Sequence, residues 1–470
     1  MRRGARCRMR CRVQSRGRSS VWSRARAVLA ATGLAWAVAS PVAAYEPEDI
    51  EAAVAIARDV RADVEWLADD AREGRYPGSQ GWLDTQDYLI DQLEPIAEGL
   101  VDAPGRAAFL HHFTLTIPVL SPDELLLANV VAAIPGSDLA DEYVIVGGHY
   151  DHLPSWRCSA VNGDDLCNGA MDNAAGTAAV LAIARAVASL PAPPRRSIVF
   201  ALWDAEEYGL KGSEYFVKTD PLVPLEDVAA YVNLDLIGAN LAPSLRDTSF
   251  AVGAESGGEL LVQMTRDAIA EVELDIRLIS RLFGQGRSDY AWFDTTANVP
   301  FVYFGDSTNA CYHSGGDEIE LVDLGKLADQ AEAAFRLVLA LAEADEPPSW
   351  ASGTQPSYYE DLVVVSEVLT KALADIEHLP ANWQQTLIDL EEQARERVAL
   401  GPETYNVNWA FEAGLGAIEI AEDGFPCDAQ LLPEPEVASL AALASLWALT
   451  ARRRRFARCR TTARPEARAR

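Results

Sequence analysis

The chain has few basic residues between its two ends. Residues 1–44 hold ten Arg, and residues 452–470 hold nine Arg and one Glu, so the rest of the chain has 21 basic and 69 acidic residues and a net charge near −48. A protein that binds nucleic acid needs a basic face for the phosphates. The charge pattern therefore argues against nucleic acid as a partner. It is typical of a soluble exported protein whose acidic residues maintain solubility.

The chain also lacks the Cys-x-x-Cys spacing of zinc-binding cysteine pairs, so metal binding by cysteine is not expected. Residues 45–432 contain four cysteines, Cys158, Cys167, Cys311 and Cys427. An even number in an exported chain indicates disulfides, and four cysteines allow three pairings. The local pair would close the loop "CSAVNGDDLC", and the other two cysteines would then tie the C-terminal region to the core. The sequence alone leaves the pairing open.

The N-terminus has the pattern of a secretory signal peptide. An Arg-rich start is followed by the apolar run "AVLAATGLAWAVASPVAA", which ends in small residues. Such a run is removed by signal peptidase, so the pattern predicts a signal peptide at residues 1–44 and a mature chain that starts at Tyr45.

The C-terminal apolar run, Val437–Ala451, has 15 residues, which is short for a membrane span of about 20. It lies between Pro433-Glu434-Pro435 and the cluster Arg452–Arg455. Residues 433–470 therefore resemble the PEP-type sorting signals of Gram-negative bacteria, and a simple tail anchor is the alternative. The resemblance implies an exported protein, located in the periplasm, on the outer surface or outside the cell. Its partners would include export and sorting machinery, with membrane contact only through the unprocessed tail.

The middle of the chain has no repeat of fixed period, and its pattern changes near Leu126. Residues 47–100 are predicted to be mainly helical. Beyond them, the apolar runs "LLANVVAAI", "YVIVGGH", "RSIVFALWD", "AAYVNLDL" and "VPFVYFG" alternate with helical segments such as "NAAGTAAVLAIARAVASL". This alternation predicts an α/β fold with a mainly parallel central sheet and helices on both faces. After a Pro/Ser-rich break, residues 357–425 are predicted to form a helical C-terminal extension of open function.

Polar side chains stand where the predicted strands end. His149 and Asp151 follow the run "VIVGG", and residues two apart in a strand share a face. The other polar candidates stand at later strand ends or before the Ala-rich helix: Asp172, Glu206, Glu207, Asp235 and His313. Ligands of such sheets bind at the carboxyl ends of the strands. We therefore expect these side chains to lie close together.

These residue types suit a metal-dependent hydrolase. Two histidines and three carboxylates are ligands that zinc accepts, and five ligands serve two ions if one carboxylate bridges them. Two ions about 3.5–4 Å apart activate a shared water for attack on a carbonyl. A nearby carboxylate then carries the proton to the leaving group. The pair Glu206-Glu207 supplies one ligand and one base, because adjacent side chains point apart. Taken singly, each residue has an ordinary explanation, such as helix capping by Asp172.

Six segments resemble, in order, the motifs of the di-zinc exopeptidase family. They are "GGHYDHL", "GAMDNAAGTAAVL", "FALWDAEEYGLKGSEYF", "NLDLIG", "RSDYAWF" and "YHSGGDEIE". The family includes bacterial leucyl aminopeptidase, aminopeptidase Y, glutamate carboxypeptidase and the glutaminyl cyclases. The resemblance covers about residues 55–345. It implies a phosphorylase/hydrolase-like zinc exopeptidase fold for a domain at residues 45–346, with two Zn2+ ions as cofactors.

The resemblance also implies roles for the candidate residues. One zinc would be bound by His149 and Asp235, the second by Glu207 and His313, and both by Asp172. Glu206 would be the general base and then the acid, and Asp151 would hold the imidazole of His149 in one tautomer. The peptide bond after Asp172 would be cis.

The donor that stabilises the oxyanion is left open. Some secreted aminopeptidases of the family have a tyrosine three residues before the Ser-Asp pair, and here that position is Gln285. An amide donates a hydrogen bond as well. Tyr290 and Tyr312 are the alternatives.

The leading hypothesis is a secreted zinc aminopeptidase that acts on the N-terminus of a peptide or protein, with Asp289 as a candidate for holding the α-amino group. A carboxypeptidase of the same family would need a cationic site, for which Arg281 and Arg287 are available. A glutaminyl cyclase, which uses one zinc, is a further alternative. A non-catalytic relative is disfavoured, because every ligand and Glu206 are present. Side-chain preference and oligomeric state are not determined by these motifs.

Overall fold

The computed structural model describes residues 45–355 and 357–427. The predicted signal peptide at 1–44 and the sorting tail at 433–470 lie outside the described residues and stay predictions. Among the described residues, no helix combines the length and the apolar composition that a membrane crossing requires.

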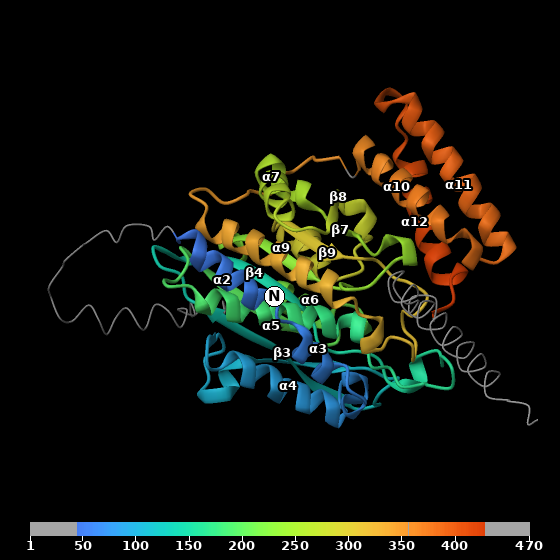
Figure 1. Cartoon of the computed structure of the whole chain (residues 1–470). Helices are drawn as coiled ribbons and strands as arrows, with labels where there is room; N and C mark the ends of the chain where they lie inside the picture. Colours follow the sequence, from blue (N-terminus) through green and yellow to red (C-terminus); the bar gives the residue numbers. More distant parts are fainter. Residues whose placement is uncertain (1–44, 356, 428–470) are drawn as a thin grey trace, which may run out of the picture.

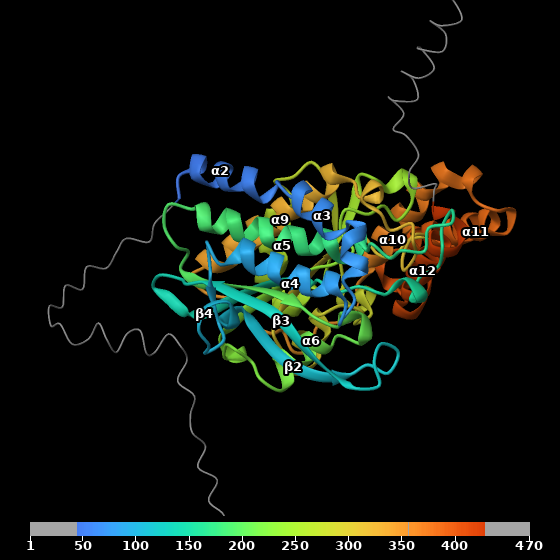
Figure 2. The ribbon, with the colours of Figure 1, turned by 90° about the horizontal axis from the view of Figure 1, so that it is seen from below.

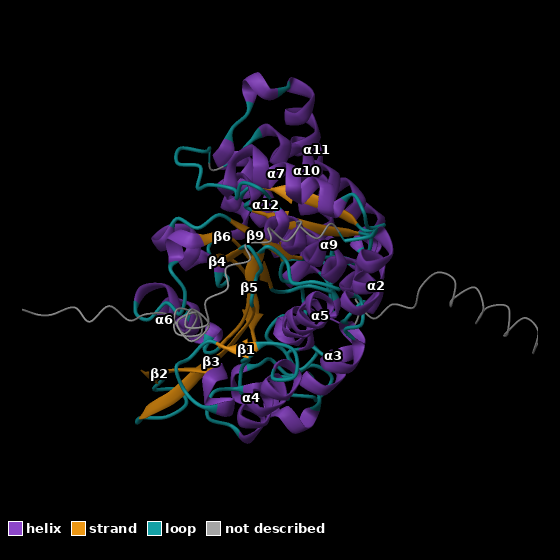
Figure 3. Cartoon of the chain, turned by 90° about the vertical axis from the view of Figure 1, so that its left-hand side faces the viewer, coloured by secondary structure: helices purple, strands orange, loops and turns teal. Residues whose placement is uncertain are grey.

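The described residues form one nine-stranded sheet that runs through the molecule (Figure 3). The strands are β1 (Glu98–Gly99), β2 (Leu110–Thr116), β3 (Glu124–Ile134), β4 (Leu139–His149), β5 (Arg196–Trp203), β6 (Val228–Leu234), β7 (Thr248–Val252), β8 (Asp275–Ile279) and β9 (Phe301–Gly305). Their order is β1-β3-β5-β4-β6-β9-β7-β8, and β2 also pairs with β3. The central strands β5, β4, β6 and β9 are parallel to their neighbours in this group. The pairs β3–β5 and β7–β9 are antiparallel.

Helices cover both faces of the sheet. The longer helices are α2 (Pro47–Ala57), α3 (Arg61–Leu67), α4 (Gln80–Leu93), α5 (Ala175–Ser189), α6 (Lys211–Lys218), α7 (Gly258–Ile269), α9 (Leu324–Glu343), α10 (Tyr359–Ala372), α11 (Ala381–Leu400) and α12 (Val407–Glu419). In β4, Val144 and Val146 pack with α2, α5 and α9, whereas Ile145 belongs to the apolar cluster that contains α6 and α10. Figure 3 shows the strands between α6 on one side and α2, α5 and α9 on the other. The predicted fold class is therefore confirmed.

The sequence missed the strands at the margins of the sheet. All five apolar runs predicted as strands are found as β3, β4, β5, β6 and β9. In contrast, β8 is five residues long and half-exposed at most of its positions. Edge strands of this kind pack on fewer neighbours and do not need a continuous apolar run. This explains β2 and β8. Strand β7 lies between β9 and β8, is buried at four of its five positions, and was missed as well.

The helical extension predicted at residues 357–425 is present, with helical segments from Tyr359 to Gly424. Helices α10, α11 and α12 pack against one another at one end of the molecule (Figures 1 and 2). The carboxylate of Asp361, in α10, accepts a hydrogen bond of 2.9 Å from the main-chain N–H of Ser280. The cysteines pair as Cys158–Cys167 and Cys311–Cys427. The second disulfide joins the end of the extension to the loop that follows β9.

Candidate metal centre

His149 is the last residue of β4 and is buried at the carboxyl end of the parallel strands. Its Nδ1 lies 3.0 Å from the main-chain carbonyl oxygen of Asp151. The hydroxyl of Thr177, in α5, donates to the carbonyl of His149 at 2.7 Å. A proton on Nδ1, shared with that carbonyl, leaves the lone pair of Nε2 free to bind a cation.

The carboxylate of Asp151 has a different place from the expected one. Its Oδ1 is 3.8 Å from Nδ1 of His149, and it accepts a hydrogen bond of 2.9 Å from the main-chain N–H of Glu206. Thus the carbonyl of Asp151 orients the imidazole, and its carboxylate holds the loop that carries Glu206. The reason is local: β4 ends at His149, so the alternation of faces along a strand does not extend to Asp151.

Asp172 lies in a loop that is held on several sides. The carboxylate of Asp317 accepts hydrogen bonds from the main-chain N–H groups of Met171 and Asp172, at 2.7 and 3.1 Å. The side chain of Asn173 donates to the carbonyl of Leu234 and accepts from an N–H in the first turn of α5. The Asp172–Asn173 peptide bond is cis, as the resemblance implied. These contacts fix Asp172 between β6, α5 and the loop that carries Asp317.

The five predicted ligands meet around Asp172. Its Oδ1 lies 3.1 Å from Nε2 of His149, which in turn lies 3.3 Å from Oδ1 of Asp235. Its Oδ2 lies 3.2 Å from Nε2 of His313, which lies 3.1 Å from Oε2 of Glu207. The two oxygens of one carboxylate therefore face two separate imidazole–carboxylate pairs. This is the arrangement expected of a bridging ligand.

The chemistry of these groups fits two cations. Oδ1 of Asp235 and Nε2 of His313 are buried and make no hydrogen bond within the part of the chain that the structure describes. Zinc ligands lie about 2.0–2.1 Å from the ion in a tetrahedral arrangement, which separates neighbouring ligand atoms by about 3.3 Å. The spacing of the five groups matches that separation. Metal binding itself, and the number of ions, stay predictions.

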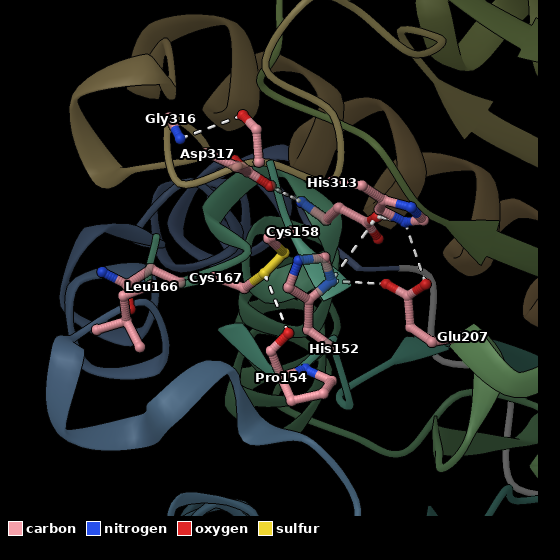
Figure 4. Close-up of a disulfide and its surroundings, with 12 residues drawn as sticks. His152, Pro154, Cys158, Leu166, Cys167, Glu207, His313, Gly316 and Asp317 are labelled. Carbon is pink, nitrogen blue, oxygen red and sulfur yellow. Dashed lines mark hydrogen bonds and ion pairs between the residues drawn. A yellow bond between two sulfur atoms is a disulfide. The ribbon is translucent and has the colours of Figure 1, made fainter. Parts of the chain in front are cut away.

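A third histidine, His152, lies in the same cluster and was missed by the sequence analysis. Its Nδ1 is 2.6 Å from Oε1 of Glu207 and 3.8 Å from Oδ2 of Asp172. Its ring meets the ring of His313 edge to face (Figure 4). The short contact indicates that His152 orients the carboxylate of Glu207, although His152, Asp172 and Glu207 also lie close enough together to share a cation. The signal was present as the second histidine of "HYDH".

The electrostatics of the cluster couple imidazoles to carboxylates. Burial opposes protonation of His149, but the carboxylates of Asp235 and Glu206 outweigh it and raise its pKa well above the usual value. Burial likewise opposes ionisation of Asp172, but the two imidazoles outweigh it and hold its pKa well below the usual range. The same balance raises the pKa of His313 to about 10. The carboxylates thus stabilise positive charge at this point, which is the property of a cation site.

Glu206 lies beside the cluster. It begins the short helix η5 (Glu206–Tyr208), and its Oε2 is 4.0 Å from Nε2 of His149. Burial raises its pKa well above the usual value, and the neighbouring carboxylates of Glu207 and Asp235 add to the rise against the opposing effect of His149. Its carboxylate lies at the cleft beside the cluster, so Glu206 is placed to exchange a proton with a group bound there.

The candidates for binding the substrate differ in whether they line the cleft that opens on the cluster. Gln285, Tyr312 and Arg287 line this cleft. Tyr290 is buried, does not line it, and accepts a hydrogen bond from the N–H of Gly286. Asp289 is also buried away from the cleft, where its carboxylate accepts a hydrogen bond from Ser213. Gln285 and Tyr312 are therefore better placed than Tyr290 to reach a substrate carbonyl.

A buried arginine links the loops of the site. The guanidinium of Arg75 donates to the carbonyls of Tyr150, Asn168, Gly169 and Leu67, at 2.6–2.9 Å. Two of these loops carry His149 and Asp172, and burial lowers the pKa of Arg75 to about 10. No sequence pattern predicts this role, because all four partners are main-chain atoms and three are more than 70 positions away.

Comparison with known proteins identifies related chains. Residues 129–338 match the model of Peptidase family M28. Leupeptin-inactivating enzyme 1 of Streptomyces exfoliatus is 30% identical over 231 residues, which are 48% of this chain and 45% of that protein. Probable glutamate carboxypeptidase LAMP1 of Arabidopsis thaliana is 32% identical over 237 residues, 47% of this chain and 32% of that protein. The chain thus spans less than half the length of these relatives.

Among solved structures, the Legionella pneumophila LapA aminopeptidase is similar to this chain, with 20% sequence identity and a TM-score of 0.49. The similarity covers 66% of this chain and 79% of that one.

Proposed function

Because residues 129–338 match the model of Peptidase family M28, we propose that this chain is a zinc-dependent exopeptidase whose reaction takes place at the cluster around Asp172. The observation that supports it most is the division of the two Asp172 oxygens between separate imidazole–carboxylate pairs. The ligands proposed for two zinc ions are His149, Asp172, Glu207, Asp235 and His313.

The mechanism assigns proton transfer to Glu206. When bound, two zinc ions would polarise the scissile carbonyl and lower the pKa of the attacking water. The carboxylate of Glu206 removes a proton from that water and delivers it to the nitrogen of the leaving amine. The N–H of Glu206, held by Asp151, fixes the start of this loop, and His152 holds the neighbouring Glu207.

An aminopeptidase is the form of this activity that the charges favour. Three carboxylates, Asp172, Glu206 and Asp235, line the inner end of the cleft. Asp172 and Asp235 would be neutralised by the cations that they bind, whereas the carboxylate of Glu206 stays free to attract the α-ammonium group of a peptide and to repel a C-terminal carboxylate. We therefore propose that the substrate is the free N-terminus of a peptide or protein.

A carboxypeptidase is the second candidate, and one residue favours it. Arg287 lines the cleft and is exposed to solvent, with its guanidinium 5.9 Å from the ring centre of Tyr312. A guanidinium in this place would bind the carboxylate of a substrate.

Export is part of the proposal. Disulfides persist in oxidising compartments, so the pairs Cys158–Cys167 and Cys311–Cys427 support a location outside the cytoplasm. We propose the periplasm, the outer surface or the medium of a Gram-negative bacterium, reached through export and sorting machinery.

Peptides blocked at one end test the proposed activity. The zinc-loaded protein is incubated with one peptide that is amidated at its C-terminus and one that is acetylated at its N-terminus, and the products are followed by mass spectrometry. We expect the amidated peptide to lose residues from its free N-terminus. Shortening of the acetylated peptide instead would establish the carboxypeptidase. Loss of ammonia alone from a peptide with N-terminal Gln would indicate a cyclase, and no product from any peptide would refute the proposed function.

A further inference from the structure

The cleft at the metal cluster is bounded at its far end by the C-terminal extension. Its inner end is lined by carboxylates and His149, and its far end includes Val364, Val365 and Val368 of α10 and Ala417 of α12. The cleft encloses about 980 Å³, including its open mouth. Helices α10 and α12 lie beyond residues 129–338, so this wall is outside the part of the chain that matches the family model.

The part of the cleft next to α10 and α12 is also apolar. It is formed by β7, β8 and the short helix η9 (Arg281–Gly284), through Phe250, Val252, Ile279 and Phe283. Every residue that α10 and α12 contribute to the cleft is uncharged. A charged side chain placed there would lose its hydration without gaining a partner, whereas an apolar side chain would be stabilised by burial. The cleft thus has a charged end, where the reaction takes place, and an apolar end.

A disulfide, a hydrogen bond and a close helix contact fix the position of the extension. Cys427 is bonded to Cys311, two residues before His313, and the hydroxyl of Thr308 donates to the carboxylate of Glu422. Helix α12 also approaches η9 closely at Gly414, where an added Cβ would lie 2.8 Å from Cε1 of Phe283. The apolar wall is therefore held at a defined place relative to the metal cluster.

We propose that α10 and α12 form the specificity pocket of the enzyme, and that this pocket takes a large apolar side chain from the residue whose peptide bond is cleaved. For an aminopeptidase this is an N-terminal Leu, Phe or Met. The proposal rests on the proposed function. The pocket is continuous with Glu206 and Asp235, so it would receive the side chain next to the peptide bond that is cleaved. The chain's own extension, and not the family-matched region alone, then sets the substrate class.

A substitution that fills the pocket tests the proposal. Values of kcat/KM are measured for aminoacyl p-nitroanilides of Leu, Phe, Ala and Lys with the wild-type chain, Val365→Trp and the matched control Glu360→Gln, which alters an exposed residue of α10. We expect the wild type to favour Leu and Phe over Ala and Lys by about tenfold or more. Val365→Trp should lower the ratio of kcat/KM for Leu and Phe over Ala by about tenfold, mainly by raising KM for Leu and Phe. The control should keep the wild-type ratio.

A second variant and a binding measurement cover the case in which the tryptophan disturbs folding. Val365→Ala enlarges the pocket, so the ratio of kcat/KM for Phe over Leu should rise relative to the wild type. Binding of free L-phenylalanine and L-alanine by the zinc-loaded chain, measured by calorimetry, reports on the pocket without turnover. Equal activity on Leu and Ala, unchanged by either variant, would overturn the pocket and leave the peptidase standing. Selective binding of L-phenylalanine without any hydrolysis would refute the peptidase and support the pocket.

Discussion

Glu206 and Glu207 are adjacent in the chain but face different groups. Both oxygens of Glu207 are engaged, one by His152 at 2.6 Å and the other by His313 at 3.1 Å. The carboxylate of Glu206 comes no closer than 4.0 Å to His149, at the edge of the cleft. In the proposed mechanism, the same dipeptide offers one side chain to a cation and leaves the other for proton transfer.

This division predicts the effect of Glu206→Gln. The amide cannot accept the proton of the attacking water, so kcat should fall by about 10²–10⁴-fold, while the zinc content stays that of the wild type. Steady-state kinetics and elemental analysis check the two expectations. Glu226→Gln, at an exposed position outside the cleft, is the control. A variant that kept full activity would remove Glu206 from the mechanism.

Substitution of Arg75, which lies outside the cleft, is expected to lower the stability of the fold. Lysine cannot reproduce four hydrogen bonds to carbonyls that point at a planar guanidinium, so buried acceptors would be left without partners. Arg75→Lys should lower the free energy of unfolding by about 2–4 kcal/mol. Urea denaturation measures it, with Arg61→Lys at an exposed position as the control. Equal stability of the two variants would show that the guanidinium contributes little.

The residues that the sequence predicted are those with a local signal. His149 and Asp235 end apolar strands, and Asp172 precedes an apolar helix, so the topology of the sheet brings them together. Arg75 gave no signal, because its partners are main-chain atoms. The contact of Asp151 with His149 was assigned to the carboxylate and not to the main-chain carbonyl, since the strand ends two residues before Asp151.

At the scale of elements, the strongest link between the extension and the site is the Cys311–Cys427 disulfide. It closes a sequence separation of 116 residues, and it lies beside the loop with Tyr312 and His313. Long closures restrict the unfolded chain more than short ones. The bond therefore stabilises the fold and holds the end of the extension against the site.

Replacing both cysteines by serine should test these two effects together. The Cys311→Ser/Cys427→Ser variant should lose about 2–5 kcal/mol of unfolding free energy. It should also show a raised KM for apolar substrates, because the wall formed by α12 is no longer tied to the loop. Denaturation and kinetics measure the two effects, and Glu412→Gln, exposed on α12, is the control. A stable variant with an unchanged KM would mean that packing alone holds the extension.

The helices and strands that the sequence predicts are those whose burial requires a regular pattern of apolar residues. Buried central strands are continuous apolar runs, and α5 and α9 have wide apolar faces. The residues 357–425 were predicted as helical, but their contact with the cleft was not. That contact depends on which face of α10 meets β8, and a local sequence pattern does not report a contact such as Asp361 with Ser280, which are 81 positions apart.

At the scale of the whole molecule, a strongly acidic chain gathers several carboxylates and three histidines at one end of its sheet. The surface carboxylates are solvated, whereas those of Asp172, Asp235 and Glu207 are packed together at the base of the cleft. Such a group is stable when positive charge lies within it. Cations at this point are therefore the feature on which the proposed function depends most.

The metal content of the chain is the most direct test of this central claim. The purified protein is exposed to zinc, desalted and examined by elemental analysis, together with the Asp172→Asn variant. We expect two zinc ions per chain for the wild type and a clear loss in the variant, because the bridging carboxylate is removed. A wild-type chain that retains no zinc, or that keeps the same amount after Asp172→Asn, would contradict it.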